Sequence, residues 1–117
     1  MSPEAAAHEL VTRLLSAANS DNATIVKAAP GRIYSITGWN AAAVTYLKLY
    51  NKATAPASTD TPLHTEYLAA SQKFQLSFPR GLNFTAGIGY RLVTGVADND
   101  ATAVAAAAVL GLNIDYG

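Results

Sequence analysis

The chain has no cysteine, and this absence removes three classes of protein chemistry at once. Disulfide bonds, zinc–thiolate sites and cysteine nucleophiles all need the missing thiol. The redox compartment in which the protein works stays open, because a chain without thiols fits either an oxidising or a reducing one.

Charge is also scarce. Only 14% of the 117 residues are charged, the eight basic and eight acidic residues cancel, and no run of like charges occurs. Nucleic acids and anionic membranes are usually bound by clustered basic residues, so we expect neither as a partner. A weakly charged surface is easily desolvated, which suits stable association with other proteins.

Long apolar runs are missing as well. The longest, "AVAAAAVLGL", is rich in alanine and too short to span a membrane. The N-terminal "MSPEAAAHEL" lacks the basic segment and apolar core of a signal peptide, so none is expected.

What the chain does contain is a series of short stretches in which apolar and polar residues alternate, separated by turn residues. In "KFQLSF" three apolar residues alternate with three polar ones, and the following "PRG" is expected to end the strand. The final "VLGLNIDYG" predicts a strand with Asn113 and Asp115 facing out. Its expected inward residues are Leu110, Leu112, Ile114 and Tyr116.

About seven to eight such strands without intervening helices predict an all-β fold, an antiparallel β-sandwich of jelly-roll type formed by one domain over residues 1–117. Residues 1–20 would form an N-terminal arm or the first strand. Ser2 and Pro3 fit a helix start. Over residues 9–16, helical spacing and a two-sided strand fit the apolar pattern equally well.

The stretch from Tyr46 to His64, "YLKLYNKATAPASTDTPLH", changes character halfway. Its first five residues have apolar side chains on both faces, which predicts a strand covered on both sides. The candidates for contacts between copies are Tyr46, Leu47, Leu49 and Tyr50. Lys52 to Leu63 has no periodicity, and a long loop in a small domain is usually disordered or functional. We expect it to contact a partner through Lys52, Thr54, Pro56, Thr59, Asp60 and Pro62.

Residues for catalysis are not arranged in any familiar pattern. His8 and His64 have no serine or carboxylate placed for a triad, and their spacing gives no metal pair. The segment from Asp98 to Asp100 brings two carboxylates together, but it lacks the glycine and distal glutamate of a calcium loop and is favoured as a turn. We therefore expect no enzymatic activity, no cofactor and no bound metal.

Aromatic residues leave one alternative from another functional class. Trp39 together with tyrosines could stack sugars on a sandwich face, as in a carbohydrate-binding module. The tyrosines are Tyr34, Tyr46, Tyr50, Tyr67, Tyr90 and Tyr116. Tyrosines in a half-buried sheet more often lie at the edge of a core, with the hydroxyl reaching water or a neighbour.

Three segments together resemble a known group of proteins. They are "VKAAPGRIYSITGWN", "YLKLYNKATAPASTDTPLHT" and "FPRGLNFTAGIGYRLVTGVADNDATAVAAAAVLGLNIDY". They resemble a family of small structural proteins encoded among the virion genes of tailed bacteriophages. The resemblance covers about Asn22 to Tyr116. It departs from the family at Ala107 and Ala108, where a polar turn is usual, and it favours a strand near residues 10–16.

Members of this sort are similar to head decoration, or cement, proteins. The resemblance implies a β-sandwich on the outer surface of a phage capsid, commonly a homotrimer, with the major capsid protein as its partner. It implies a location on the virion, and in the host cytoplasm during assembly. A tail or head-fibre component of the same virion is the structural alternative.

Overall fold

The computed structural model describes residues 10–117, so the expectations about Ser2, Pro3 and His8 lie outside the described residues. Within that range the chain forms eight strands and no helix, and hence no helix that could cross a membrane. The strands are β1 (Leu10–Ser16), β2 (Thr24–Lys27), β3 (Gly31–Asn40), β4 (Thr45–Asn51), β5 (His64–Leu68), β6 (Gln72–Phe84), β7 (Ile88–Val93) and β8 (Val109–Tyr116).

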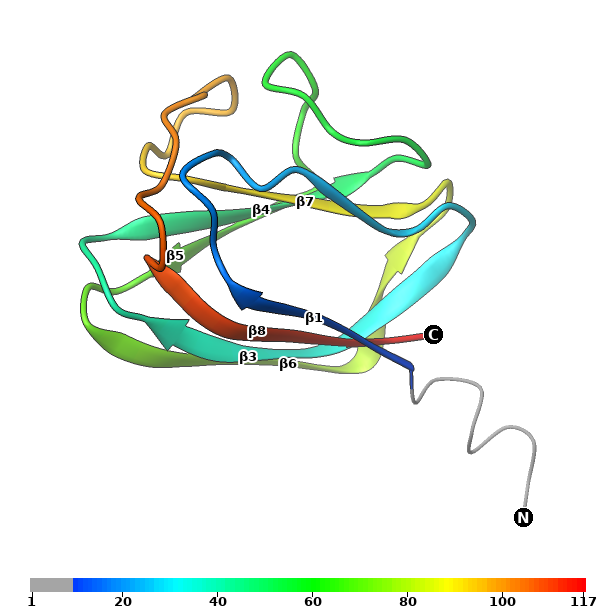
Figure 1. The fold of residues 1–117 in the computed structure, drawn as a ribbon. Coiled ribbons are helices and arrows are strands. Elements are labelled where there is room, and N and C mark those ends of the chain that lie inside the picture. The colour runs from blue at the N-terminus through cyan, green and yellow to red at the C-terminus, as the bar shows by residue number, and fades with distance from the viewer. Residues whose placement is uncertain (1–9) are drawn as a thin grey trace.

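The strands form two four-stranded sheets that face each other (Figure 1). Sheet I has the order β1-β8-β3-β6, and sheet II has the order β2-β7-β4-β5. All neighbours are antiparallel, and the pairs β1 with β8, β2 with β7, β3 with β6 and β4 with β5 are nested like one long hairpin that has been rolled up. This is the arrangement of a jelly roll, which confirms the predicted fold class.

The ambiguous N-terminal stretch is a strand. β1 lies at the edge of sheet I and pairs with β8, with Leu10 opposite Tyr116 and Leu14 opposite Leu112. Leu14 packs against the core, whereas Val11 is exposed. The backbone hydrogen bonds offered by β8 decide in favour of a strand, because an isolated seven-residue helix would have gained no comparable partner.

The core lies between the sheets and is built from alternate residues of nearly every strand. Phe74 on β6 and Leu112 and Ile114 on β8 are buried as the alternation predicts. The other fully buried large apolar residues are Ile33, Ile36, Leu47, Leu49, Leu68, Phe84, Ile88 and Leu92. Burying a side chain of this size contributes about 1.5–3 kcal/mol, so this cluster is the main source of the fold's stability.

The expectation that "PRG" ends the strand after Phe78 is wrong. β6 continues to Phe84, and the register against β3 shifts so that residues 78–81 lie opposite the single residue Tyr34. The strand accommodates Pro79 because β6 is the edge of sheet I, where a missing backbone N–H costs no ladder hydrogen bond. Gly81, with φ of 78°, completes the bulge.

The expectation that Leu110 faces the core is also wrong. Val109 and Leu112 are the buried residues, although simple alternation would place them on opposite faces. Gly111 lies between them with φ of 60°, and the register of β8 against β3 shifts there, so that Leu110 lies opposite the exposed Trp39. A bulge with glycine in the left-handed region thus inverts the pattern for the first two residues of β8.

Three residues that are not glycine have a similar backbone conformation, namely Asn22, Ser71 and Ala107. Ala107, in the turn before β8, has φ of 60°, which is costly for alanine but tolerated by asparagine. We predict that Ala107→Asn raises the free energy of unfolding by about 0.5 to 1 kcal/mol, measured by urea denaturation.

The matched control is Ala106→Asn, at an exposed neighbour that does not have a positive φ. It should leave stability unchanged or slightly lower. An equal gain from both substitutions would show that the backbone conformation of Ala107 is not the cause.

Candidate functional site

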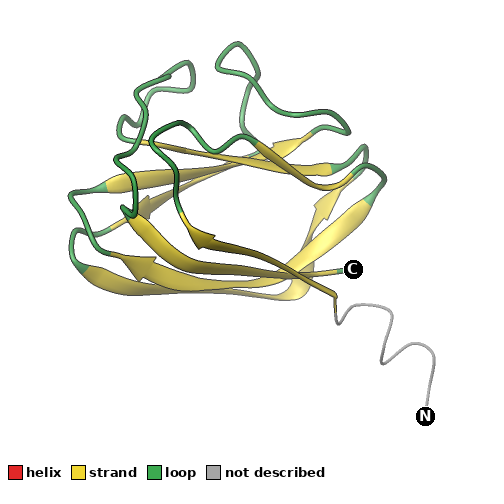
Figure 2. Cartoon of the chain, viewed as in Figure 1, coloured by secondary structure: helices red, strands yellow, loops and turns green. Residues whose placement is uncertain are grey.

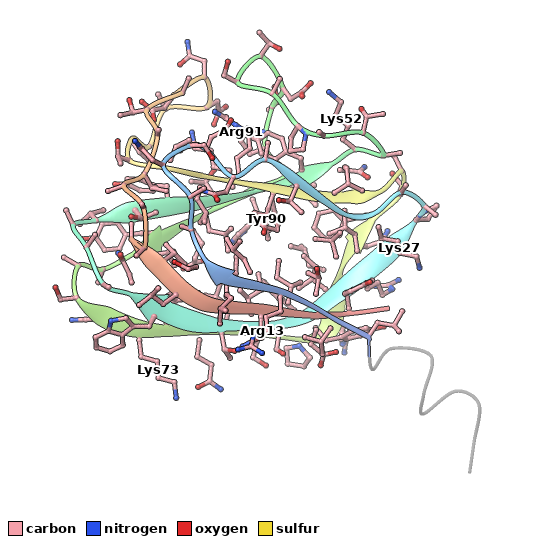
Figure 3. All side chains as sticks on the ribbon, viewed as in Figure 1. Arg13, Lys27, Lys52, Lys73, Tyr90 and Arg91 are labelled. Carbon is pink, nitrogen blue, oxygen red and sulfur yellow. The ribbon has the colours of Figure 1, made fainter. Side chains whose placement is uncertain are left out.

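Loops cover the outer side of sheet II, and a buried arginine fastens them there (Figures 2 and 3). The Arg91 side chain on β7 has no exposed surface. Its Nε donates to Asp21 Oδ2 at 2.9 Å, Nη1 to the Tyr50 hydroxyl at 3.0 Å and Nη2 to the carbonyl oxygen of Asp100 at 3.0 Å. One guanidinium therefore joins β7 to β4, to the β1–β2 connection and to the β7–β8 loop.

Lys48 on the neighbouring strand β4 is a second buried cation on this side of the sheet. It lies directly opposite Arg91 in the ladder, and its Nζ donates to the carbonyl oxygen of Ala97 in the β7–β8 loop. Burial lowers the pKa of Lys48, and Arg91 lowers it further, while Asp100 and Asp98 offset part of the effect. Burial also disfavours the charge on Arg91, but the hydrogen bonds with Asp21 and Tyr50 outweigh it and raise the pKa of Arg91.

The two buried cations Arg91 and Lys48 were not predicted from the sequence, although one signal for Lys48 was present. Lys48 stands between Leu47 and Leu49 in a stretch that was predicted to be covered on both sides. A charged residue at the centre of such a strand has to be buried with a partner, because an unpaired buried charge is very costly. Its partner could not be inferred, because Ala97 offers only its backbone oxygen.

The β7–β8 loop is shaped by the carboxylate of Asp100. Oδ2 accepts hydrogen bonds from the backbone N–H groups of Gly95 at 3.1 Å and Thr102 at 3.2 Å, and Oδ1 accepts one from the Thr102 hydroxyl at 3.1 Å. These are the turn-stabilising contacts favoured for this segment. Among residues 10–117, no three His, Cys, Asp or Glu side chains are grouped closely enough to hold a metal ion.

The β4–β5 loop, Lys52 to Leu63, is closed on itself by an ion pair. Lys52 Nζ and Asp60 Oδ2 are 2.7 Å apart, and Asp60 also accepts a hydrogen bond from the N–H of Ala57 at 2.8 Å. The Lys52 and Ala57 bonds lower the pKa of Asp60. Pro56 is buried, and a side chain on Gly89 of β7 would come within 3.1 Å of its ring. The glycine therefore permits the close approach of the loop.

The six predicted contact residues of this loop thus divide into two groups. Lys52, Asp60 and Pro56 hold the loop in its shape, and Pro62 is half-buried. Thr54 and Thr59 are exposed and remain available to a partner.

The four predicted oligomer contacts are mostly inaccessible. Leu47 and Leu49 lie in the core, and Tyr50 is buried beneath the loops as an acceptor for Arg91. Side chains without exposed surface in one copy cannot contact another, so these three are corrected to residues of the protomer's interior. Tyr46 remains partly accessible and packs edge-to-face on Tyr67, with ring centroids 5.7 Å apart.

The outer side of sheet I, in contrast, carries no loop formed by residues 10–117 (Figure 2). We call it the open face and define it by the residues that alternate with the core residues on its four strands. They are Val11, Arg13, Leu15, Ser35, Thr37, Trp39, Lys73, Gln75, Ser77, Asn113 and Asp115. Arg13 and Lys73 lie on the outer side of this sheet in Figure 3.

A hollow of about 370 Å³ lies in the open face, across the three strands β1, β8 and β3. It is lined by Val11, Ser35, Thr37, Asn113 and Asp115. Asp115 Oδ1 is buried there and has no hydrogen-bond partner among the described residues. Most buried acceptors in folded proteins are hydrogen-bonded, so this oxygen is unusual.

The aromatic residues do not form one platform. Trp39 is 45% exposed on sheet I, whereas Tyr67, 56% exposed, lies on sheet II. Tyr50 and Tyr90 are buried and cannot stack on a sugar. His64 does not belong to a catalytic pair with a nucleophile; its Nε2 lies 2.8 Å from Glu66 Oε1, and its ring packs edge-to-face on Phe78.

Comparisons with models of protein families, with curated proteins and with solved structures find no match for this chain. What the molecule does has therefore to be inferred from its fold and its two outer faces.

We predict that Arg91→Met lowers the free energy of unfolding by about 3 kcal/mol, because it leaves Asp21, Tyr50 and the Asp100 carbonyl without their shared donor. Urea denaturation measures the change. The control, Arg80→Met at an exposed arginine of sheet I, should cost less than about 0.5 kcal/mol. Equal effects of the two substitutions would show that Arg91 does not hold the fold together.

We also predict a pH dependence that belongs to Lys48. Because its pKa is below 10.5 in the folded chain, the unfolded chain holds more protons between that lowered pKa and pH 10.5, and stability rises with pH in this window. Burial raises the pKa of Tyr90, and its hydrogen bond with Thr24 offsets part of this effect. Ionisation of Tyr90 therefore destabilises the fold only above pH 10.0. The measurement therefore ends there.

Between about pH 7 and pH 10, the free energy of unfolding should rise less in Lys48→Met than in the wild type. The exposed Lys73→Met is the control and should follow the wild-type curve. Parallel curves for the wild type and Lys48→Met would contradict the assignment.

Proposed function

We propose that this chain is a structural virion protein, a capsid decoration protein that binds the outer surface of a tailed-phage head and strengthens contacts between major capsid subunits. Its place would be on the virion, and in the host cytoplasm during assembly. In this proposal the chain is not an enzyme and needs no cofactor.

The observation that carries the proposal is how the chain uses its charged side chains. Arg91, Lys48 and Asp100 are committed to fastening loops on sheet II, and the Lys52–Asp60 pair closes the β4–β5 loop. What the described part of the molecule offers to the outside is a compact block whose sheet I has one open face. Such a block suits binding in many copies to a repeating shell, where weak contacts add up.

Two further observations support the proposal. Jelly rolls are frequent among viral structural proteins, which is an analogy at the level of the fold and not evidence for a site. The net charge of zero allows crowding without mutual repulsion. The same fold also serves lectins, and the exposed Trp39 on the same sheet face as the hollow keeps a carbohydrate-binding module as the second candidate.

We further propose self-association as a homotrimer. Since Leu47, Leu49 and Tyr50 are interior residues, the accessible pair Tyr46 and Tyr67 takes their place as the candidate contact. Aromatic residues with exposed surface are enriched at such interfaces. Light scattering of the purified chain gives the oligomeric state directly.

The experiment uses particles of the virus whose genome encodes the chain. Quantitative mass spectrometry should find the chain in proportion to the major capsid protein. Particles made without the chain should lose their DNA at lower temperature, and adding the purified chain should restore their resistance. The Arg91→Met variant should restore less, because its lower stability leaves a smaller fraction of folded chains at the raised temperature.

A handful of copies per particle would instead indicate a tail or head-fibre component. Absence of the chain from purified particles would overturn the proposal. Binding of neutral hexasaccharides that is lost in Trp39→Ala would favour the carbohydrate-binding module.

A further inference from the structure

The two outer sides of the sandwich differ in their charge. Sheet I carries four exposed cations, Arg13, Arg32, Lys73 and Arg80, and one anion, Asp115. The ion pairs among residues 10–117 are Lys52–Asp60, His64–Glu66 and Arg91–Asp21, all formed outside sheet I. The zero net charge of the chain thus conceals a sheet whose strands have an excess of three positive charges.

The open face also exposes the kinds of side chain that contribute most to protein–protein binding. Trp39 is 45% exposed, and Val11 and Leu15 on the edge strand β1 are 59% and 67% exposed. Trp and Arg are the residues most enriched at the centres of protein interfaces. A docking surface commonly exposes apolar area in the free protein. Here the apolar area lies next to cations without ion pairs, and no loop of residues 10–117 covers it.

We infer that the open face of sheet I is the surface with which this chain docks, and that its partner presents an acidic protein surface there. The inference rests on the proposed function and deepens it, because it names the docking surface and the charge of the capsid surface that would meet it. Opposite charges steer the encounter and fix its register, while Trp39 and the aliphatic residues of β1 supply the buried centre.

The hollow adds a feature that selects a protein over other polyanions. Asp115 stands on the interior strand β8, in the midst of the cations, with Oδ1 buried and unpartnered among the described residues. A phosphate backbone would be repelled by this carboxylate, and a membrane surface offers it no fixed donor. A protein can place one lysine against the partly exposed carboxylate of Asp115, within a surface that is otherwise acidic.

Two other occupants fit less well. A second copy docked face to face about a two-fold axis would bring two net positive sheets together. A neutral glycan has no charge to match the cations, and Trp39 is the one exposed aromatic residue among the defined residues of the open face. Both are outcomes that the experiment can detect.

The test measures binding of the chain to capsids assembled without it, using two double variants that change the net charge equally. Arg13→Gln with Lys73→Gln removes two positive charges from the open face. Thr54→Glu with Thr59→Glu adds two negative charges to the exposed loop residues. The first variant should bind at least about tenfold more weakly and with a weaker dependence on salt, whereas the second should change affinity by less than about threefold.

Trp39→Ala should also weaken binding at least about tenfold. Unchanged circular dichroism and thermal midpoints confirm that the variants are folded. If the loop variant alone loses binding, the docking surface is the loop and the inference is overturned. If neither variant loses binding, the inference fails while the proposed function stands; if the wild-type chain itself does not bind capsids, the proposed function fails.

A second measurement tests the face independently of any virus. Poly-L-glutamate, a DNA duplex and neutral hexasaccharides are each titrated into the isotope-labelled chain at low salt. Poly-L-glutamate should shift the backbone amide signals of β1, β3, β6 and β8 and the Trp39 indole signal. Shifts confined to residues 52–63 and 94–108, or stronger shifts with DNA or a saccharide, would overturn the assignment of an acidic protein partner.

Discussion

The buried guanidinium of Arg91 is the constraint on which the rest of the structure depends. Its three donors are satisfied by a carboxylate, a hydroxyl and a backbone carbonyl from three different parts of the chain. Removing a charged group from water is costly unless each of its donors finds an acceptor, so the three acceptors and the segments that carry them must be in place together. The Arg91 side chain therefore couples the β1–β2 connection and the β7–β8 loop to sheet II.

This coupling makes the two sides of the sandwich unequal. On sheet II, the charged groups of Arg91 and Lys48 are buried and hold loops over the sheet through hydrogen bonds. On sheet I, the cations point into solvent and no loop covers them (Figures 2 and 3). A β-sandwich with two solvated faces would offer two similar polar surfaces; here loops cover one side, and no loop of residues 10–117 covers the other.

The β-sandwich could be predicted because its evidence is local. Alternation with period two in β6 and β8 identified the strands and most of their inward residues, and the turns between them excluded an α/β fold. Predictions failed where a neighbouring strand decided the outcome. Pro79 does not end β6 because the strand lies at a sheet edge, and Leu110 does not face the core because Gly111 forms a bulge against β3.

By itself the sequence determined the class of fold, the absence of thiol chemistry and the exposed threonines of the β4–β5 loop. Only the tertiary structure decided that Leu47, Leu49 and Tyr50 are interior residues, and that Arg13 and Lys73 lie on the same outer face of sheet I. The physical reason is that period and composition act between residues close in the chain. Burial of Lys48 and Arg91, and the grouping of Arg13 with Lys73, depend on segments that only the rolled topology brings together.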